Sequence, residues 1–152
     1  ISLGAAMALI YSGTERGKKI SFYVADSAYG GMMELGKDKI SAYTGDPRFL
    51  WGMDLVEPFF QSVLWLRSGK TLSDIDPLEV VRRMTAPVLF LHGGADTLIP
   101  PKTAEELLQA SGSSKKELFI FDGAGHTMEM AANGDAYRKA VRVFLESLSQ
   151  NM

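Results

Sequence analysis

The sequence predicts an α/β fold in which a parallel sheet is flanked by helices. Three short apolar runs, rich in β-branched and aromatic residues, alternate with helix-like segments along the chain, and they span residues 20–25, 87–91 and 117–121. Nearly continuous apolar runs are typical of strands that are buried on both faces. Strands that alternate with helices indicate crossover connections, and therefore a parallel sheet.

The helices are predicted from their ends and from their periodicity. Residues 5–11 form an apolar helical stretch, and residues 58–67 and 101–110 each begin with a proline and stop shortly before a glycine. Proline in the first turn and glycine just past the last turn are typical helix boundaries. The last helix carries a stripe at helical spacing that should pack on a sheet. The members of this stripe are Tyr137, Val141, Phe144, Leu145 and Leu148.

Residues 31–76 interrupt the alternation of strands and helices. This segment is too long for one simple crossover, and its aromatic residues are Phe49, Trp51, Phe59, Phe60 and Trp65. One interpretation is a lid-like helical insertion whose aromatic side chains bind substrate, with Trp51, Phe59 and Phe60 as candidates. The alternative is that the helix of residues 58–67 packs its aromatic side chains on the sheet or on neighbouring helices.

The composition is that of an ordinary globular protein, and it excludes several classes of partner. The chain has 152 residues, 46% of them hydrophobic and 22% charged, which fits a single domain over residues 1–152. The net charge of −2, without long runs of one sign, argues against a nucleic-acid surface. The longest apolar run is far shorter than the roughly 18 residues of a membrane span.

No cofactor or metal ion is expected from the sequence. The chain has no cysteine, which excludes disulfides, thiolate nucleophiles and cysteine-based metal sites. Its two histidines lie far apart without a His/Glu cluster, and neither a G-x-G-x-x-G nor a Walker A sequence occurs. The absence of cysteine and of a visible leader favours a cytoplasmic location, although the natural N-terminus is expected to lie before residue 1.

Three polar residues are expected to meet at one edge of the sheet. Ser2 lies in a small-residue turn that leads directly into an apolar helix, and residues 2–4 match the downstream half of a G-x-S-x-G nucleophile turn. Asp96 follows the second predicted strand and His126 follows the third. The carboxyl ends of parallel strands collect functional groups at a shared edge. A serine nucleophile needs a base within reach, and that base needs a carboxylate to orient it.

Other polar residues have competing interpretations. Asp26 follows the first predicted strand and could be the acid instead, although the H-G-x-x-D setting favours Asp96. His92 ends a strand and is interpreted as structural, and Asp122 is most simply a turn residue. His126 could be an ordinary histidine in a glycine-rich loop, but its position after a strand favours catalysis.

These segments together resemble the C-terminal half of an α/β-hydrolase of the serine esterase and acyl-peptidase-like kind. The matching stretches are ISLGAA, VADSAY, PVLFLHGGADTLIP and FDGAGH. The resemblance implies that the three strands are the sixth to eighth of the family's sheet. It also implies that Ser2 is the nucleophile, Asp96 the orienting acid and His126 the general base. The backbone N–H of Leu3 would be one oxyanion donor.

The implied function is hydrolysis of a carboxylic ester, thioester or small amide through an acyl-serine intermediate. The alternative is a truncated or non-catalytic binding module, because the strand before the nucleophile and the loop with the second oxyanion donor would precede residue 1. In that case Ser2 is expected to lack support for a strained backbone. The unpaired apolar edge of the sheet would then recruit the missing N-terminal half or a second copy of the chain.

Overall fold

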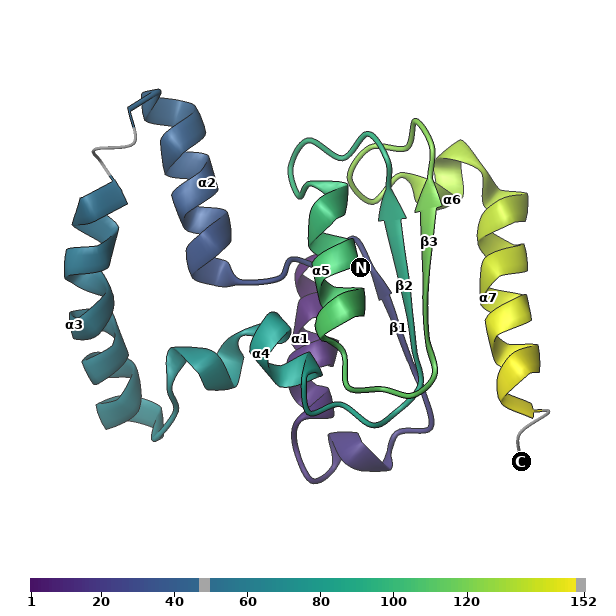
Figure 1. The fold of residues 1–152 in the computed structure, drawn as a ribbon, viewed down its shortest axis with the longest axis horizontal. Coiled ribbons are helices and arrows are strands. Elements are labelled where there is room, and N and C mark those ends of the chain that lie inside the picture. Colours follow the sequence, from purple (N-terminus) through teal and green to yellow (C-terminus); the bar gives the residue numbers. More distant parts are fainter. Residues whose placement is uncertain (47–49, 150–152) are drawn as a thin grey trace.

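The computed structural model describes residues 1–46 and 50–149, and it contains a three-stranded parallel sheet between two layers of helices (Figure 1). The strands are β1 (Tyr23–Asp26), β2 (Val88–Gly93) and β3 (Lys116–Phe121), and β2 lies in the middle. This architecture confirms the predicted α/β fold. The first strand begins three residues later than the sequence predicts, because residues 20–22 lead into the sheet without pairing in it.

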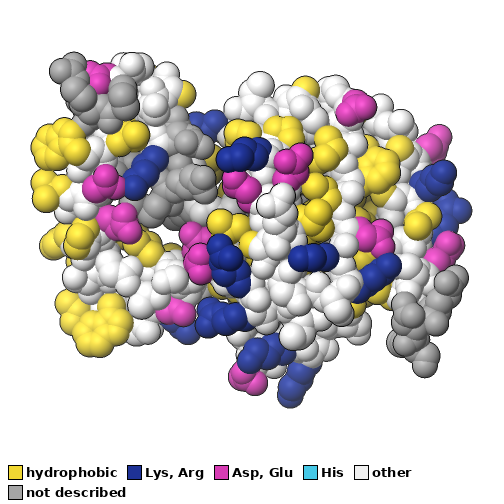
Figure 2. Space-filling view, viewed as in Figure 1, with side chains coloured by type: hydrophobic (Ala, Val, Ile, Leu, Met, Phe, Trp, Pro, Cys, Tyr) yellow, Lys and Arg dark blue, Asp and Glu magenta, His cyan; other side chains and the backbone are white. Residues whose placement is uncertain are grey.

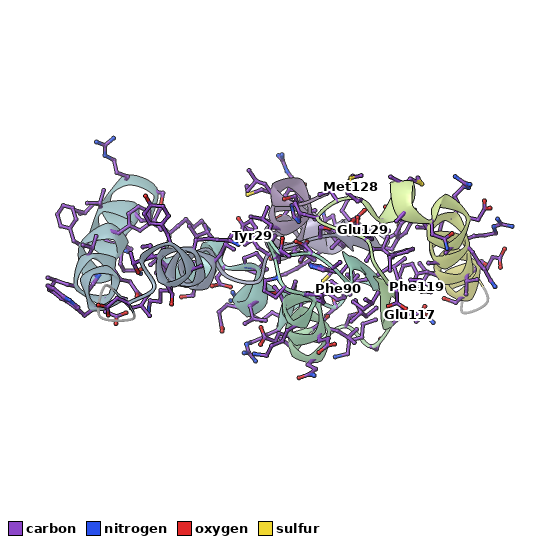
Figure 3. All side chains as sticks on the ribbon, turned by 90° about the horizontal axis from the view of Figure 1, so that it is seen from above. Tyr29, Phe90, Glu117, Phe119, Met128 and Glu129 are labelled. Carbon is purple, nitrogen blue, oxygen red and sulfur yellow. The ribbon has the colours of Figure 1, made fainter. Side chains whose placement is uncertain are left out.

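One face of the sheet is covered by α1 (Leu3–Ser12), α4 (Pro77–Val81) and α5 (Pro101–Ala110). Val88 and Phe90 of β2 point to this face, since alternate residues of a strand point to opposite sides. Figure 3 shows Phe90 on the side of α5. The buried residues that the helices contribute to this layer include Ala5, Leu9, Val81 and Leu107, and Met84 joins them from the segment after α4.

The opposite face is covered by α7 (Gly134–Ser149). Leu89 and Leu91 of β2 point to this side and pack with Phe144, which is fully buried. Because both faces of β2 are buried, its sequence is a continuous apolar run. The predicted stripe of α7 lies on the sheet except for Leu145, which is 37% exposed, so the prediction is wrong for that residue. Leu145 lies one position past the buried Phe144 and is therefore rotated away from the sheet.

Residues 31–76 form a helical excursion from the sheet, as Figure 1 shows. It contains α2 (Met32–Thr44) and α3 (Leu50–Ser68), and it returns to the sheet through α4. The prediction that a helix begins at Pro58 is wrong, because Pro58 lies inside α3. A proline inside a helix removes one backbone hydrogen bond, and here the helix continues on both sides of it.

Three short helices complete the described elements, and they are the 3-10 helices η1 (Gly17–Lys19) and η3 (Leu72–Ile75) and the α-helix α6 (Glu129–Ala132). Phe49, one of the aromatic residues assigned to the lid, lies outside the described residues. Within the ranges that the structure describes, no helix combines the length and the apolar character needed to cross a membrane.

Replacing Phe144 with alanine is expected to destabilise the protein by about 3–5 kcal/mol, because this leaves a cavity between α7 and the sheet. Urea unfolding of the variant and the parent measures the difference. Phe119→Ala is the matched control, since Phe119 on β3 is 41% exposed and should cost much less. Equal losses in the two variants would contradict the placement of the core.

Candidate active site

Ser2 immediately precedes α1 and has an unusual backbone conformation. Its φ of 51° and ψ of −122° are unfavourable for a residue with a side chain. The Ser2 N–H donates to the backbone oxygen of Asp26 at 2.8 Å, which ties the turn to the end of β1. The expectation that Ser2 lacks support for a strained backbone is therefore wrong, because β1 and α1 hold the turn from both sides.

Asp96 lies in the loop after β2, and its carboxylate is buried and fully hydrogen-bonded. Oδ1 accepts the backbone N–H groups of Leu98 and Ile99, each at 2.9 Å. Oδ2 lies 2.7 Å from Nδ1 of His126. The two backbone donors fix the carboxylate in one orientation, so Oδ2 is presented to the imidazole.

His126 lies in the loop after β3 and joins the other two residues. Its Nε2 is 2.9 Å from the Ser2 Oγ, while its Nδ1 faces Asp96. Since an ionised carboxylate can only accept hydrogen bonds, the proton of the neutral ring belongs on Nδ1. Nε2 is then free to accept the proton of the serine hydroxyl. The structure thus brings Ser2, Asp96 and His126 together in a continuous chain of hydrogen bonds.

The histidine loop packs closely on the end of β2. A Cβ added to Gly93 would lie 2.4 Å from the backbone oxygen of Ala124 and 2.7 Å from that of Gly125. Only glycine at position 93 allows this approach. The turn into the loop also needs glycine at position 123, where φ is +74°. These two glycines explain how the loop reaches the middle of the sheet edge.

His92 supports the aspartate loop from inside the protein. The side chain is fully buried at the end of β2, and Nε2 lies 2.9 Å from the backbone oxygen of Ile99. The same nitrogen lies 3.4 Å from Oδ2 of Asp96. These contacts agree with the structural interpretation of His92, which holds the loop between Asp96 and Ile99.

The remaining predicted residues are placed as follows. The backbone N–H of Leu3, the first residue of α1, has no acceptor within the helix. Asp26 does not contact His126, because its Oδ2 instead accepts a hydrogen bond from the Tyr137 hydroxyl at 2.9 Å. Asp122 is exposed in the turn after β3.

The aromatic side chains assigned to substrate binding lie on α3 and are not brought to the serine. Trp51, Phe59 and Phe60 are 67%, 71% and 47% exposed. In Figure 1, α2 lies between α3 and the sheet, and Figure 2 shows hydrophobic side chains gathered at the outer surface of α3. The alternative interpretation, in which this helix packs its aromatic residues on the sheet or on neighbouring helices, does not describe Trp51 and Phe59, which are mostly exposed. Their role in substrate binding stays a prediction.

A buried polar cluster beside the site was not predicted. Glu129 begins α6 (Glu129–Ala132) and is fully buried, and Asp26 is only 5% exposed. The Ser27 hydroxyl donates to Oε1 of Glu129 at 2.6 Å and accepts the backbone N–H of Thr127 at 3.2 Å. The sequence signal was weak, because Ser27 looks like a turn residue and Glu129 lies in a short segment without clear periodicity.

The cluster changes the acid–base properties of two of its members. Burial raises the pKa of Asp26, and the negative charge of Glu129 raises it further. Burial and the nearby Asp26 also raise the pKa of the Tyr137 hydroxyl. Both groups are therefore held in their protonated forms to higher pH than usual. Among the described residues, no group of three or more acidic, histidine or cysteine side chains is arranged to hold a metal ion.

Comparison with known proteins finds similarity to hydrolases. Residues 70–131 match the family described as serine aminopeptidase, S33. An uncharacterized Bacillus subtilis protein, YqkD, is 31% identical over 150 residues. This alignment covers 99% of the chain but 47% of the relative, so the chain spans about half the length of that protein.

Solved structures share the fold. The Pyrococcus furiosus esterase Pf2001 superposes with a TM-score of 0.65 and 23% identity, over 97% of this chain and 52% of the esterase. A monoacylglycerol lipase from Paleococcus ferrophilus has a TM-score of 0.59 and 21% identity, over 97% of this chain and 66% of the lipase. At these identities the likeness establishes the fold of the sheet and its helices.

Proposed function

We propose that this chain, which resembles α/β-hydrolases in sequence and in fold, is a serine hydrolase that uses an acyl-serine intermediate. Its substrate class is a carboxylic ester, thioester or small amide. The observation that carries this proposal is the chain of hydrogen bonds from the Ser2 hydroxyl through His126 to Asp96. This geometry matches the requirement that a serine nucleophile contacts a base whose orientation is fixed by an acid.

The proposed reaction follows from the positions of these atoms. Ser2 Oγ attacks the carbonyl carbon of the substrate while Nε2 of His126 takes the hydroxyl proton. The tetrahedral intermediate then expels the alcohol, thiol or amine, which receives that proton from His126. Water attacks the acyl-serine in the same way and restores the free hydroxyl. Asp96 keeps the imidazole in the required tautomer and stabilises its positive charge.

The backbone N–H of Leu3 is proposed as one oxyanion donor. It lies at the first residue of α1, next to the Ser2 hydroxyl, and the positive end of the helix dipole adds to its effect. A donor of this kind typically contributes about 10²–10³ in rate. The left-handed backbone of Ser2 supports this role, because a sharp turn can present the hydroxyl and the following N–H to one carbonyl group.

A fluorophosphonate probe tests the proposal directly. We expect the probe to form one covalent adduct, which peptide mass spectrometry locates at Ser2, and to stop the hydrolysis of p-nitrophenyl acetate. Heat-unfolded protein is the control, because it keeps Ser2 but loses the hydrogen bond to His126. Absence of the adduct in the folded protein would favour the alternative function, a non-catalytic binding module.

A further inference from the structure

Three non-glycine residues among those that the structure describes have a left-handed backbone, and all three meet at the buried cluster beside the site. Ser2 has a φ of 51°, Ser27 of 52° and Thr127 of 59°. Such conformations each cost about 1–3 kcal/mol and persist only where the surroundings enforce them. Ser2 belongs to the serine turn, and Thr127 directly follows His126. The strain is therefore concentrated at the segments that carry the two reacting side chains.

Hydrogen bonds connect these strained segments to each other through β1. The serine turn is tied to the backbone oxygen of Asp26 at 2.8 Å. The histidine loop is tied to the Ser27 hydroxyl, which accepts the Thr127 N–H at 3.2 Å and donates to Glu129 at 2.6 Å. Figure 3 shows Glu129 directed inward from α6. Asp26 and Ser27 are thus adjacent in the chain, and Asp26 holds the serine turn while Ser27 holds the histidine loop.

The carboxyl groups of Asp26 and Glu129 would each lack one hydrogen-bond donor if both were ionised. Oδ1 of Asp26 and Oε2 of Glu129 are buried and have no protein donor. Two buried carboxylates repel each other, and an unpaired buried charge is costly. A single proton held between them removes one charge and supplies the missing donor, as in other carboxylate pairs that share a site. Burial and the charge of Glu129 raise the pKa of Asp26 in agreement with this.

We propose that Asp26 and Glu129 share one proton, and that this pair, acting through Ser27, positions the serine turn and the histidine loop for the reaction. This role rests on the proposed function of Ser2 and His126. Tyr137 of α7 is the third titratable group at the pair, where its hydroxyl donates to Asp26. Asp26, Ser27 and Glu129 are positioning residues, because each acts through the backbone of a neighbouring segment.

The pH dependence has a definite sign. A carboxyl whose pKa is raised by folding binds a proton that the unfolded chain releases, so the stability it contributes is complete at acidic pH. This contribution declines as the pH rises from the ordinary aspartate value of about 3.9 through the raised pKa. Loss of the shared proton leaves two buried negative charges, which should loosen Ser27 and lower kcat in the same pH range.

The test compares the parent with Glu129→Gln, whose amide can supply the N–H permanently. Both kcat for p-nitrophenyl acetate and the free energy of unfolding in urea are measured between about pH 5 and pH 9. His126 serves as the general base in both proteins, whereas only the parent can lose the shared proton. We therefore expect the ratio of kcat in Glu129→Gln to kcat in the parent, and the corresponding difference in unfolding free energy, to rise with pH. The parent should also show an infrared band of a protonated carboxyl that is lost as the pH rises through the raised pKa of Asp26, and this band should be absent in the variant. If Glu129→Gln shows the same pH dependence of kcat and of unfolding free energy as the parent, the proposal of a shared proton is refuted.

Ser27→Ala tests the positioning role, with Ser113→Ala as the matched control. Ser113 is also buried, and its hydroxyl likewise donates one hydrogen bond and accepts one, but it lies at the opposite edge of the sheet. We expect Ser27→Ala to lower kcat by up to about 10²-fold with little change in KM, as small displacements of reacting groups do. Ser113→Ala should leave kcat unchanged. Equal kcat values in the two variants would overturn the proposal.

A failure of the proposed function is distinguishable from a failure of this inference. If the parent hydrolyses no ester, the unfolding and infrared measurements still decide whether the pair shares a proton. The NMR resonance of the Nδ1 proton of His126 then decides the positioning role without turnover. Its chemical shift should change in Ser27→Ala and remain that of the parent in Ser113→Ala. An unchanged chemical shift in both variants would refute the positioning role.

Discussion

Replacing Ser2 with alanine is expected to reduce ester hydrolysis to the uncatalysed background. The Ser2 hydroxyl is the group that His126 contacts at 2.9 Å, and no covalent intermediate can form without it. Removal of the nucleophile from a serine triad typically lowers kcat by about 10⁶-fold. The measurement is the steady-state rate with p-nitrophenyl acetate, together with the loss of fluorophosphonate labelling.

Two further variants make this result specific. Ser12→Ala removes another buried serine hydroxyl, at the far end of α1, where it donates to the backbone oxygen of Leu9. This control should keep full turnover. Ser2→Gly should be as inactive as Ser2→Ala but more stable by about 1 kcal/mol, because glycine adopts a φ of 51° without strain. Labelling that survives in Ser2→Ala would refute the assignment of the nucleophile.

Asp96→Asn is expected to lower kcat by up to about 10⁴-fold while the protein stays folded. The amide keeps the size of the carboxylate and still accepts the N–H groups of Leu98 and Ile99. It can also donate to Nδ1 of His126, which favours the wrong tautomer and occupies Nε2 with the ring proton. Steady-state kinetics measure the loss, and circular dichroism checks the fold.

The control for this prediction is Asp135→Asn, since the Asp135 side chain is 96% exposed on α7, where it pairs with Arg138. It should leave kcat unchanged. Asp26→Asn should lower kcat far less than Asp96→Asn, because the Asp26 carboxyl contacts Tyr137 rather than His126. If Asp26→Asn caused the larger loss, the acid of the triad would have to be reassigned to the end of β1.

Local sequence patterns predicted most of the sheet and its helices but not their details. The strand β2 was predictable because buried parallel strands consist of apolar runs, and all of its residues are buried. The apolar run of β3 also predicted a strand, although it lies at the edge of the sheet and most of its residues are only partly buried. The extent of α3 was not predictable, since Pro58 suggests a helix start, whereas tertiary context keeps the preceding residues helical. The surroundings of Trp51 and Phe59 were also misjudged, because aromatic spacing does not reveal what a helix packs against.

The sequence by itself determined the order and the chemical types of the candidate triad, because each residue follows a recognisable strand or turn. Only the tertiary structure decided how these residues are held. The hydrogen bond from Ser2 to Asp26 and that from Thr127 to Ser27 join segments about 25 and 100 residues apart. The proximity of Asp26 to Glu129 likewise depends on bringing the start of α6 to the residue that follows β1, where the Ser27 hydroxyl donates to Glu129. Such contacts leave no local pattern, because burial and charge proximity arise only when distant segments meet.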